Sequence, residues 1–61
     1  MCQARKIVNA ASDARHAEDM AEFDVMIQSI DTCDGGRERV FTFTDGSKLI
    51  VAAEDYRWEV A

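Results

Sequence analysis

Proline is absent from the chain, and glycine and cysteine are scarce, with three and two residues respectively. Without Pro or a Ser/Gly-rich linker, the sequence has no stretch at which it would divide, so residues 1–61 should fold as a single small domain. No apolar run approaches the roughly 18 residues that suggest a membrane span, and no apolar signal segment follows Met1. The chain is therefore expected to be cytoplasmic, with no membrane association.

The two cysteines, Cys2 and Cys33, are too few for the disulfide framework of a small secreted domain. We expect both to be free thiols in a reducing compartment, with a single long-range or intermolecular bridge as the alternative. A domain of this size buries only about 60% of its unfolded surface, so its core alone gives marginal stability. Such a domain gains stability from a partner or from a second copy of the chain.

Catalytic and ligand-binding motifs are also missing. His16 is the single histidine that could activate Cys33 or a serine, and no spacing indicates a catalytic triad. Asp13 lies three residues before it, but two side chains do not close a metal site. Residues 31–36 lack the alternating oxygen ligands of a calcium loop, and the glycines are used by turns, which leaves no phosphate-binding loop. We expect no enzyme activity, no metal and no cofactor.

Negative charge is in excess, with 12 acidic against 7 basic residues and a net charge of −5. Residues 10–34 hold seven acids against Arg15, for −6, whereas residues 1–9 carry +2 and residues 35–61 carry −1. A field of this sign repels the phosphates of nucleic acids and attracts basic protein surfaces. Direct binding of nucleic acid is therefore disfavoured.

Five carboxylates of the negative segment are candidate partner-binding residues: Asp13, Glu18, Asp19, Glu22 and Asp24. One interpretation is a solvated face that keeps a small protein soluble. The other is that acids spaced along a helix present negative charge to a basic groove on a partner, in a site meant for nucleic-acid phosphates. Salt would weaken such binding.

The N-terminal part of the chain predicts a helix over residues 4–22. Ala, Arg, Glu and Met are frequent there, and neither Gly nor Pro interrupts the segment. Small residues recur at three- and four-residue spacing and would let the helix lie close against a sheet. This stripe consists of Ile7, Ala11, Ala14, Ala17 or Glu18, and Ala21. A start at Ser12, a candidate N-cap, would instead shorten the helix and leave residues 6–8 extended.

The strongest strand signal surrounds Asp45-Gly46, where β-branched and aromatic runs flank a pair typical of hairpins. Gly accepts the positive φ of a tight primed turn, so we expect strands on both sides, over residues 37–44 and 47–53. Residues 23–33 fit both helical spacing and strand alternation. The turn residues that follow them, Asp34-Gly35-Gly36, favour a strand and a second hairpin.

In the last segment, apolar and charged side chains alternate: Tyr56, Arg57, Trp58, Glu59 and Val60. This pattern indicates a short final strand with one aromatic face. Tyr56 and Trp58 either close the core at the open end of the sheet or anchor a protein interface beside Arg57 or Arg39. The predicted fold is therefore α+β, an N-terminal helix followed by a three- or four-stranded antiparallel β meander over residues 23–60.

The succession of strand, Asp-Gly-Gly, strand, Asp-Gly-Ser and strand resembles the meander of small SH3-like barrels over roughly residues 23–60. An SH3-like domain that binds a short peptide or nucleic acid would have an exposed aromatic groove containing Trp58 or Tyr56. In size, acidity and lack of catalytic residues, the whole chain is similar to small phage-encoded accessory proteins, among them the anti-CRISPR inhibitors. This similarity implies a stoichiometric binder that blocks a larger machine in the host cytoplasm.

The leading hypothesis is a non-enzymatic protein-binding module, an inhibitor that docks an acidic face on a basic complex that handles nucleic acid. The alternative from another class is a small structural or assembly subunit that forms a homodimer through a sheet edge or the Ala-rich helix. Salt discriminates between the two, because it weakens an acidic-face binder and leaves a hydrophobic dimer nearly unchanged.

Overall fold

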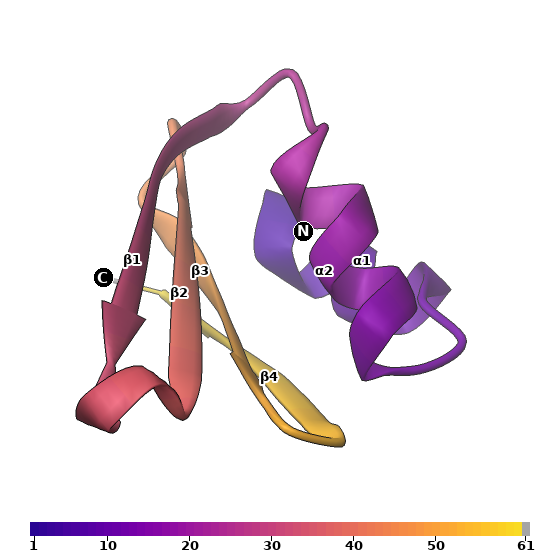
Figure 1. The fold of residues 1–61 in the computed structure, drawn as a ribbon. Helices are drawn as coiled ribbons and strands as arrows, with labels where there is room; N and C mark the ends of the chain where they lie inside the picture. The colour runs from indigo at the N-terminus through magenta and orange to yellow at the C-terminus, as the bar shows by residue number, and fades with distance from the viewer. Residues whose placement is uncertain (61) are drawn as a thin grey trace.

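The structure is a computed structural model that describes residues 1–60. Its elements are α1 (Gln3–Ala10), α2 (Ala14–Glu22), β1 (Ile27–Cys33), a short 3₁₀ turn η1 (Asp34–Gly36), β2 (Glu38–Phe43), β3 (Ser47–Ala52) and β4 (Asp55–Val60). The strands pair antiparallel in the order β1-β2-β3-β4, and both helices cover the same face of the sheet (Figure 1). The predicted α+β fold is confirmed, with the meander in its four-stranded form.

The prediction of a single helix over residues 4–22 is wrong, because the helix breaks between Ala10 and Ala14. The backbone of Ala11 is extended, with φ −72° and ψ 143°. α2 then begins at the N-cap Asp13, whose carboxylate accepts a hydrogen bond from the backbone N–H of His16 at 2.8 Å. The alternative start at Ser12 is one residue too early, and residues 6–8 are helical.

The small-residue stripe is confirmed as the contact between the helices and the sheet. Ala14, Ala17 and Ala21 of the predicted stripe are buried, Ala11 is partly buried, and Ala4, which the stripe did not include, is buried as well. Together with Ile7 of α1 they pack against the large apolar side chains of the two central strands, which are Phe41, Phe43, Leu49 and Val51. Because this stripe lies in the core, it is not available for a homodimer through the Ala-rich helix.

The β2–β3 hairpin is confirmed, but its loop is not the expected primed turn. Gly46 has a positive φ of 88°, whereas Asp45 does not, and a type I′ turn needs a positive φ at both central residues. The N–H of Gly46 donates to the carbonyl of Phe43 at 2.9 Å. This pattern is that of a three-residue loop, a type I turn followed by a left-handed glycine.

The ambiguous segment over residues 23–33 contains a strand, as favoured, but the strand begins only at Ile27. Asp24 organises the turn before it, since its carboxylate accepts a hydrogen bond from the N–H of Met26 at 2.8 Å. The second hairpin pairs β1 with β2, and a β-bulge shifts the register near the start of β1.

The sheet has two open edges. β1 and β4 each pair on one side, so within residues 1–60 the meander does not close into an SH3-like barrel. On the face opposite the helices, Ile50 is only 4% exposed and lies beside Val40. Arg57 and Glu38 form an ion pair at 3.7 Å on this face. Side chains of the sheet itself therefore cover much of the face that the helices leave open.

Asp45 connects the β2–β3 loop to the start of α1. One carboxylate oxygen accepts the N–H of Gln3 at 2.8 Å, and the other accepts the N–H and the hydroxyl of Ser47 at 2.9 and 2.6 Å. The buried Ser47 hydroxyl in turn accepts the N–H of Ala4 at 3.1 Å. Cys2, the N-cap of α1, makes no side-chain capping bond. The loop therefore satisfies N–H groups that the first turn of a helix leaves without partners.

Acid should destabilise the domain partly through Asp45. The hydrogen bonds from the Ser47 hydroxyl, then from the N–H groups of Gln3 and Ser47, lower the pKa of Asp45 from its ordinary 3.8. A carboxyl with a lowered folded-state pKa contributes stability that is present above its ordinary pKa and lost as the pH falls through the lowered one. We expect the urea midpoint of Asp45→Asn to lie below that of the wild type at neutral pH.

The difference in urea midpoint between the wild type and Asp45→Asn should shrink as the pH falls below about 3.8. Asp31→Asn, which changes an exposed carboxyl of β1, serves as the control and should follow the wild type throughout. A wild-type advantage over Asp45→Asn that stayed constant down to the lowest pH would contradict the assigned role of Asp45.

Candidate protein-binding surface

Three of the five predicted carboxylates have structural partners. Asp13 is the N-cap of α2. Glu18 forms an ion pair with Arg39 of β2 at 2.8 Å. Asp24 accepts the side-chain amide of Gln3 in addition to the turn bond described above. These three carboxylates therefore stabilise the domain itself: Asp13 caps α2, Glu18 joins α2 to β2, and Asp24 joins α1 to the connection before β1.

The other two carboxylates, Asp19 and Glu22, have no hydrogen bond or ion pair with any part of residues 1–60. Both are exposed on α2, and their spacing of three residues puts them on one side of the helix. The last turn of α2 contains no basic residue. The predicted acidic site is thereby reduced to a pair of uncompensated charges near the C-terminus of α2.

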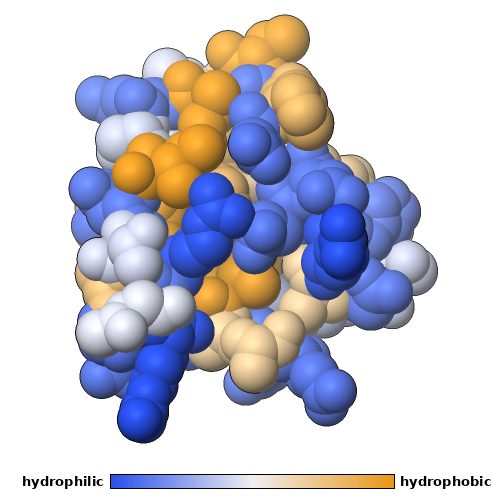
Figure 2. All heavy atoms as spheres, viewed as in Figure 1, coloured by the Kyte–Doolittle hydropathy of each residue, from blue (hydrophilic) through white to orange (hydrophobic). Residues whose placement is uncertain are grey.

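Exposed apolar side chains directly follow this acidic pair. Phe23 is 81% exposed and Val25 is 99% exposed. Figure 2 shows apolar side chains gathered at the top of the molecule, over the connection from α2 to β1 seen in Figure 1. Exposed aromatic and aliphatic side chains that lie together are typical of interaction sites. We call Asp19, Glu22, Phe23 and Val25 the α2 tip.

Sequence reasoning missed the apolar half of the α2 tip. Phe23 fits the spacing of a helix that continues into the core and also the alternation of a strand that starts there. Either spacing is typical of a residue that builds the fold rather than of an exposed one. The turn chemistry of Asp24, two residues before the apolar Met26, is the signal that could have placed Phe23 in a connection.

The two predicted aromatic anchors have different environments. Tyr56 is half-buried, packs against the core and donates its hydroxyl to the carbonyl of Ala11 at 3.3 Å. Trp58 on β4 is 37% exposed, and the guanidinium of Arg5 lies 5.4 Å from its ring centroid. Tyr56 therefore holds the break between the helices to the sheet, while Trp58 is covered on one side by α1.

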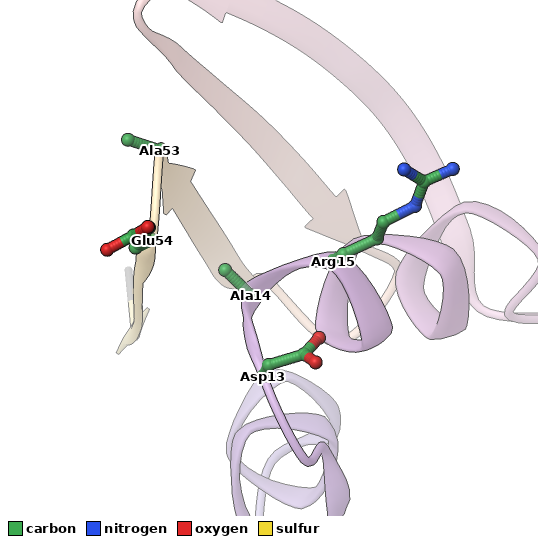
Figure 3. A pocket seen from close by; sticks show the side chains of 5 residues that line it. All are labelled: Asp13, Ala14, Arg15, Ala53 and Glu54. Carbon is green, nitrogen blue, oxygen red and sulfur yellow. The ribbon is translucent and has the colours of Figure 1, made fainter.

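An open hollow of about 330 Å³ lies between the start of α2 and the β3–β4 turn (Figure 3). Its lining residues are Asp13, Ala14, Arg15, Ala53 and Glu54. The Arg15 side chain points away from both carboxylates, and Asp13 is already engaged as a helix cap (Figure 3). The hollow contains no aromatic side chain, so it is not the aromatic groove expected of an SH3-like ligand-binding domain.

The single histidine takes part in the connection between the helices. Nδ1 of His16 accepts the N–H of Ser12 at 3.1 Å and lies 3.1 Å from the Ser12 hydroxyl. Both residues are exposed. Cys2 and Cys33 are free thiols, as expected. Within residues 1–60, no group of three or more His, Cys, Asp or Glu side chains converges on a point where a metal ion could bind.

Together these features define a small two-layer α+β domain that exposes an acidic and apolar surface, the α2 tip. Comparisons with protein-family models, with curated proteins and with solved structures found no match for the chain. None of the helices in the described part of the chain is both long enough and apolar enough to cross a bilayer. Its function is therefore inferred from its own residues.

Proposed function

We propose that this protein is a non-enzymatic protein-binding module that docks its α2 tip on a basic surface of a larger protein or nucleoprotein complex that handles nucleic acid. The observation that carries this proposal is the placement of Asp19 and Glu22. Acids near a helix C-terminus oppose the helix dipole at a cost of about 0.3–1 kcal/mol each, and like charges three residues apart repel. The helix dipole and like-charge repulsion both disfavour these two carboxylates, although the domain is small and only marginally stable. Unfavourable interactions of this kind are expected at functional sites.

The two halves of the α2 tip would contribute differently to binding. Phe23 is an aromatic side chain of the kind that anchors interface centres, and Val25 extends the apolar contact. Asp19 and Glu22 at its rim would steer association and fix the orientation on a basic surface. On a partner surface that binds phosphates, these carboxylates would occupy the positions of the phosphates. Docking would therefore compete with nucleic acid. This is the mode of action expected of an inhibitor of the anti-CRISPR type.

The test is an affinity capture from a bacterial lysate at low and at high salt, with the bound proteins identified by mass spectrometry. Wild-type protein should recover one large basic complex at low salt. Asp19→Lys with Glu22→Lys should reduce this recovery by about tenfold or more, because both carboxylates are lost and the ammonium groups that replace them repel the basic surface. Phe23→Ala should also reduce recovery, because it removes the apolar anchor without changing the charge.

A matched control separates the α2 tip from net charge alone. Asp31→Lys with Glu54→Lys makes the same change in net charge at exposed positions outside the α2 tip. This control should recover the complex at close to the wild-type level. Equal loss in the control and in the α2-tip variant, or full recovery by both α2-tip variants, would sink the proposal.

A further inference from the structure

The outer edge of β4 is regular and unpaired. β4 pairs with β3 along its whole length with no register shift, beginning with Asp55 opposite Ala52. Ala53 and Glu54 form the turn between β3 and β4, and Ala53 has a positive φ of 48°. In a two-residue hairpin the closing pair exchanges hydrogen bonds, and bonded and non-bonded pairs alternate from there.

Three residues of β4 therefore direct their backbone N–H and C=O groups away from β3: Tyr56, Trp58 and Val60. Within the described part of the chain, no strand pairs with this edge. The N–H of Tyr56 donates to the carboxylate of Asp55 at 3.0 Å, an exposed contact that an incoming strand would replace. A row of outward backbone groups of this kind is a template for another strand. The side chains of Trp58 and Val60, which are 37% and 62% exposed, add apolar surface along the same edge.

The sequence of β4 is complementary to itself in one antiparallel register. With a two-fold axis at Trp58, the outward-directed residues of the two copies meet, Trp58 opposite Trp58 and Tyr56 opposite Val60. On the other face of the sheet, Arg57 of each copy lies opposite Glu59 of the second copy. These charges fall in non-hydrogen-bonded pairs, where facing side chains are closest. We propose that two copies of this chain associate through β4 in this register and form one continuous sheet.

The opposite edge of the sheet fits a second copy less well. β1 contains a bulge near its start, which interrupts the row of outward groups and is one way in which proteins block an edge. Asp31 is the single charged residue of β1, so two copies would have no opposite charges to set their register. The charge complementarity of Arg57 and Glu59 selects β4.

The proposed interface is small, because it joins two six-residue strands. It falls below the roughly 1,600 Å² that stable complexes bury, so the dissociation constant should lie in the micromolar range. Each copy also carries a net charge of −5, which opposes association at low salt. Association is therefore best measured near physiological ionic strength, where the Debye length is about 8 Å.

The experiment is sedimentation velocity of the whole chain over a series from low to several hundred micromolar protein. The wild type should show a concentration-dependent monomer–dimer equilibrium. Glu59→Arg and Arg57→Glu alone should each weaken association by about tenfold, because each places like charges opposite each other. An equal mixture of these two variants should restore dimers, since Arg57 then faces Glu59 and the introduced Arg faces the introduced Glu.

Two further variants make the result decisive. Asp31→Lys, on the β1 edge, is the matched charge control and should dimerise like the wild type. Val60→Pro removes an outward N–H without removing a bond to β3, and should abolish dimers even where the charge changes prove mild. A wild type that is monomeric at every concentration, dimers that no β4 variant weakens, or a mixture that fails to restore association would each overturn the proposal. None of these outcomes bears on the α2 tip, so the two proposals fail separately.

Discussion

Replacing Phe41 with Ala should leave the domain largely unfolded at room temperature in water. Phe41 is fully buried in β2 and belongs to the cluster that joins both helices to the sheet. Truncating a buried Phe to Ala costs about 3–5 kcal/mol. A chain of 61 residues has a free energy of unfolding of about 3–9 kcal/mol, at about 0.05–0.15 kcal/mol per residue. The expected loss is therefore comparable to the whole stability of the fold.

Phe23→Ala is the matched control, because it makes the same chemical change at a side chain that is 81% exposed. Its free energy of unfolding should stay within about 0.5 kcal/mol of the wild type. Far-ultraviolet circular dichroism and urea titration measure both variants. A cooperative transition of Phe41→Ala near the wild-type midpoint would show that Phe41 is not a core residue.

Ala17→Leu should have the second-largest effect. Ala17 is fully buried in α2, where its methyl group separates the helix from the sheet. Cores are close-packed, so three added carbon atoms force the helix away from the sheet or into strained rotamers, at a cost of about 1–3 kcal/mol. We expect a lower urea midpoint and faster amide hydrogen exchange across α2.

Ala10→Leu controls for the effect of Leu on helix propensity, since Ala10 ends α1 and is exposed. It should leave the urea midpoint nearly unchanged, because Ala and Leu have similar helix propensities. Equal midpoints for Ala17→Leu and Ala10→Leu would mean that the small residues of α2 are not needed for close packing.

Local chemistry was enough to predict much of the sheet. The hairpin at Gly46 follows from a glycine that accepts a positive φ between two runs of β-branched and aromatic residues. The alternation in the last segment likewise predicted β4. These features depend on neighbours in the chain, and so they can be recognised without the tertiary structure.

The break between the helices was not predicted, because nothing in residues 11–13 forbids a helix. One contact from elsewhere in the chain and one local helix cap accompany the break. The hydroxyl of Tyr56 on β4 binds the carbonyl of Ala11, and the cap at Asp13 starts the second helix. β-Sheets are twisted, and two short helices can follow the twist more closely than one straight helix. Both helices can therefore bury their alanines against the sheet.

The candidate site was predicted in part. Its acidic residues were recognised from charge, but Glu18 is neutralised by Arg39, and Asp24 binds Gln3. Each of these partners lies 21 positions away in the chain, and local patterns carry no information about such contacts. The exposure of Phe23 also depends on where α2 ends relative to the sheet.

The sequence by itself determined the α+β class, the central hairpin and the excess of negative charge, because these follow from local pattern and from counting. Only the tertiary structure decided where the helix breaks, which carboxylates remain without partners, and that Phe23 and Val25 face solvent. The physical reason is that burial and charge pairing are properties of surfaces brought together by folding. Asp45 illustrates it, since its carboxylate caps a helix that begins more than forty residues earlier.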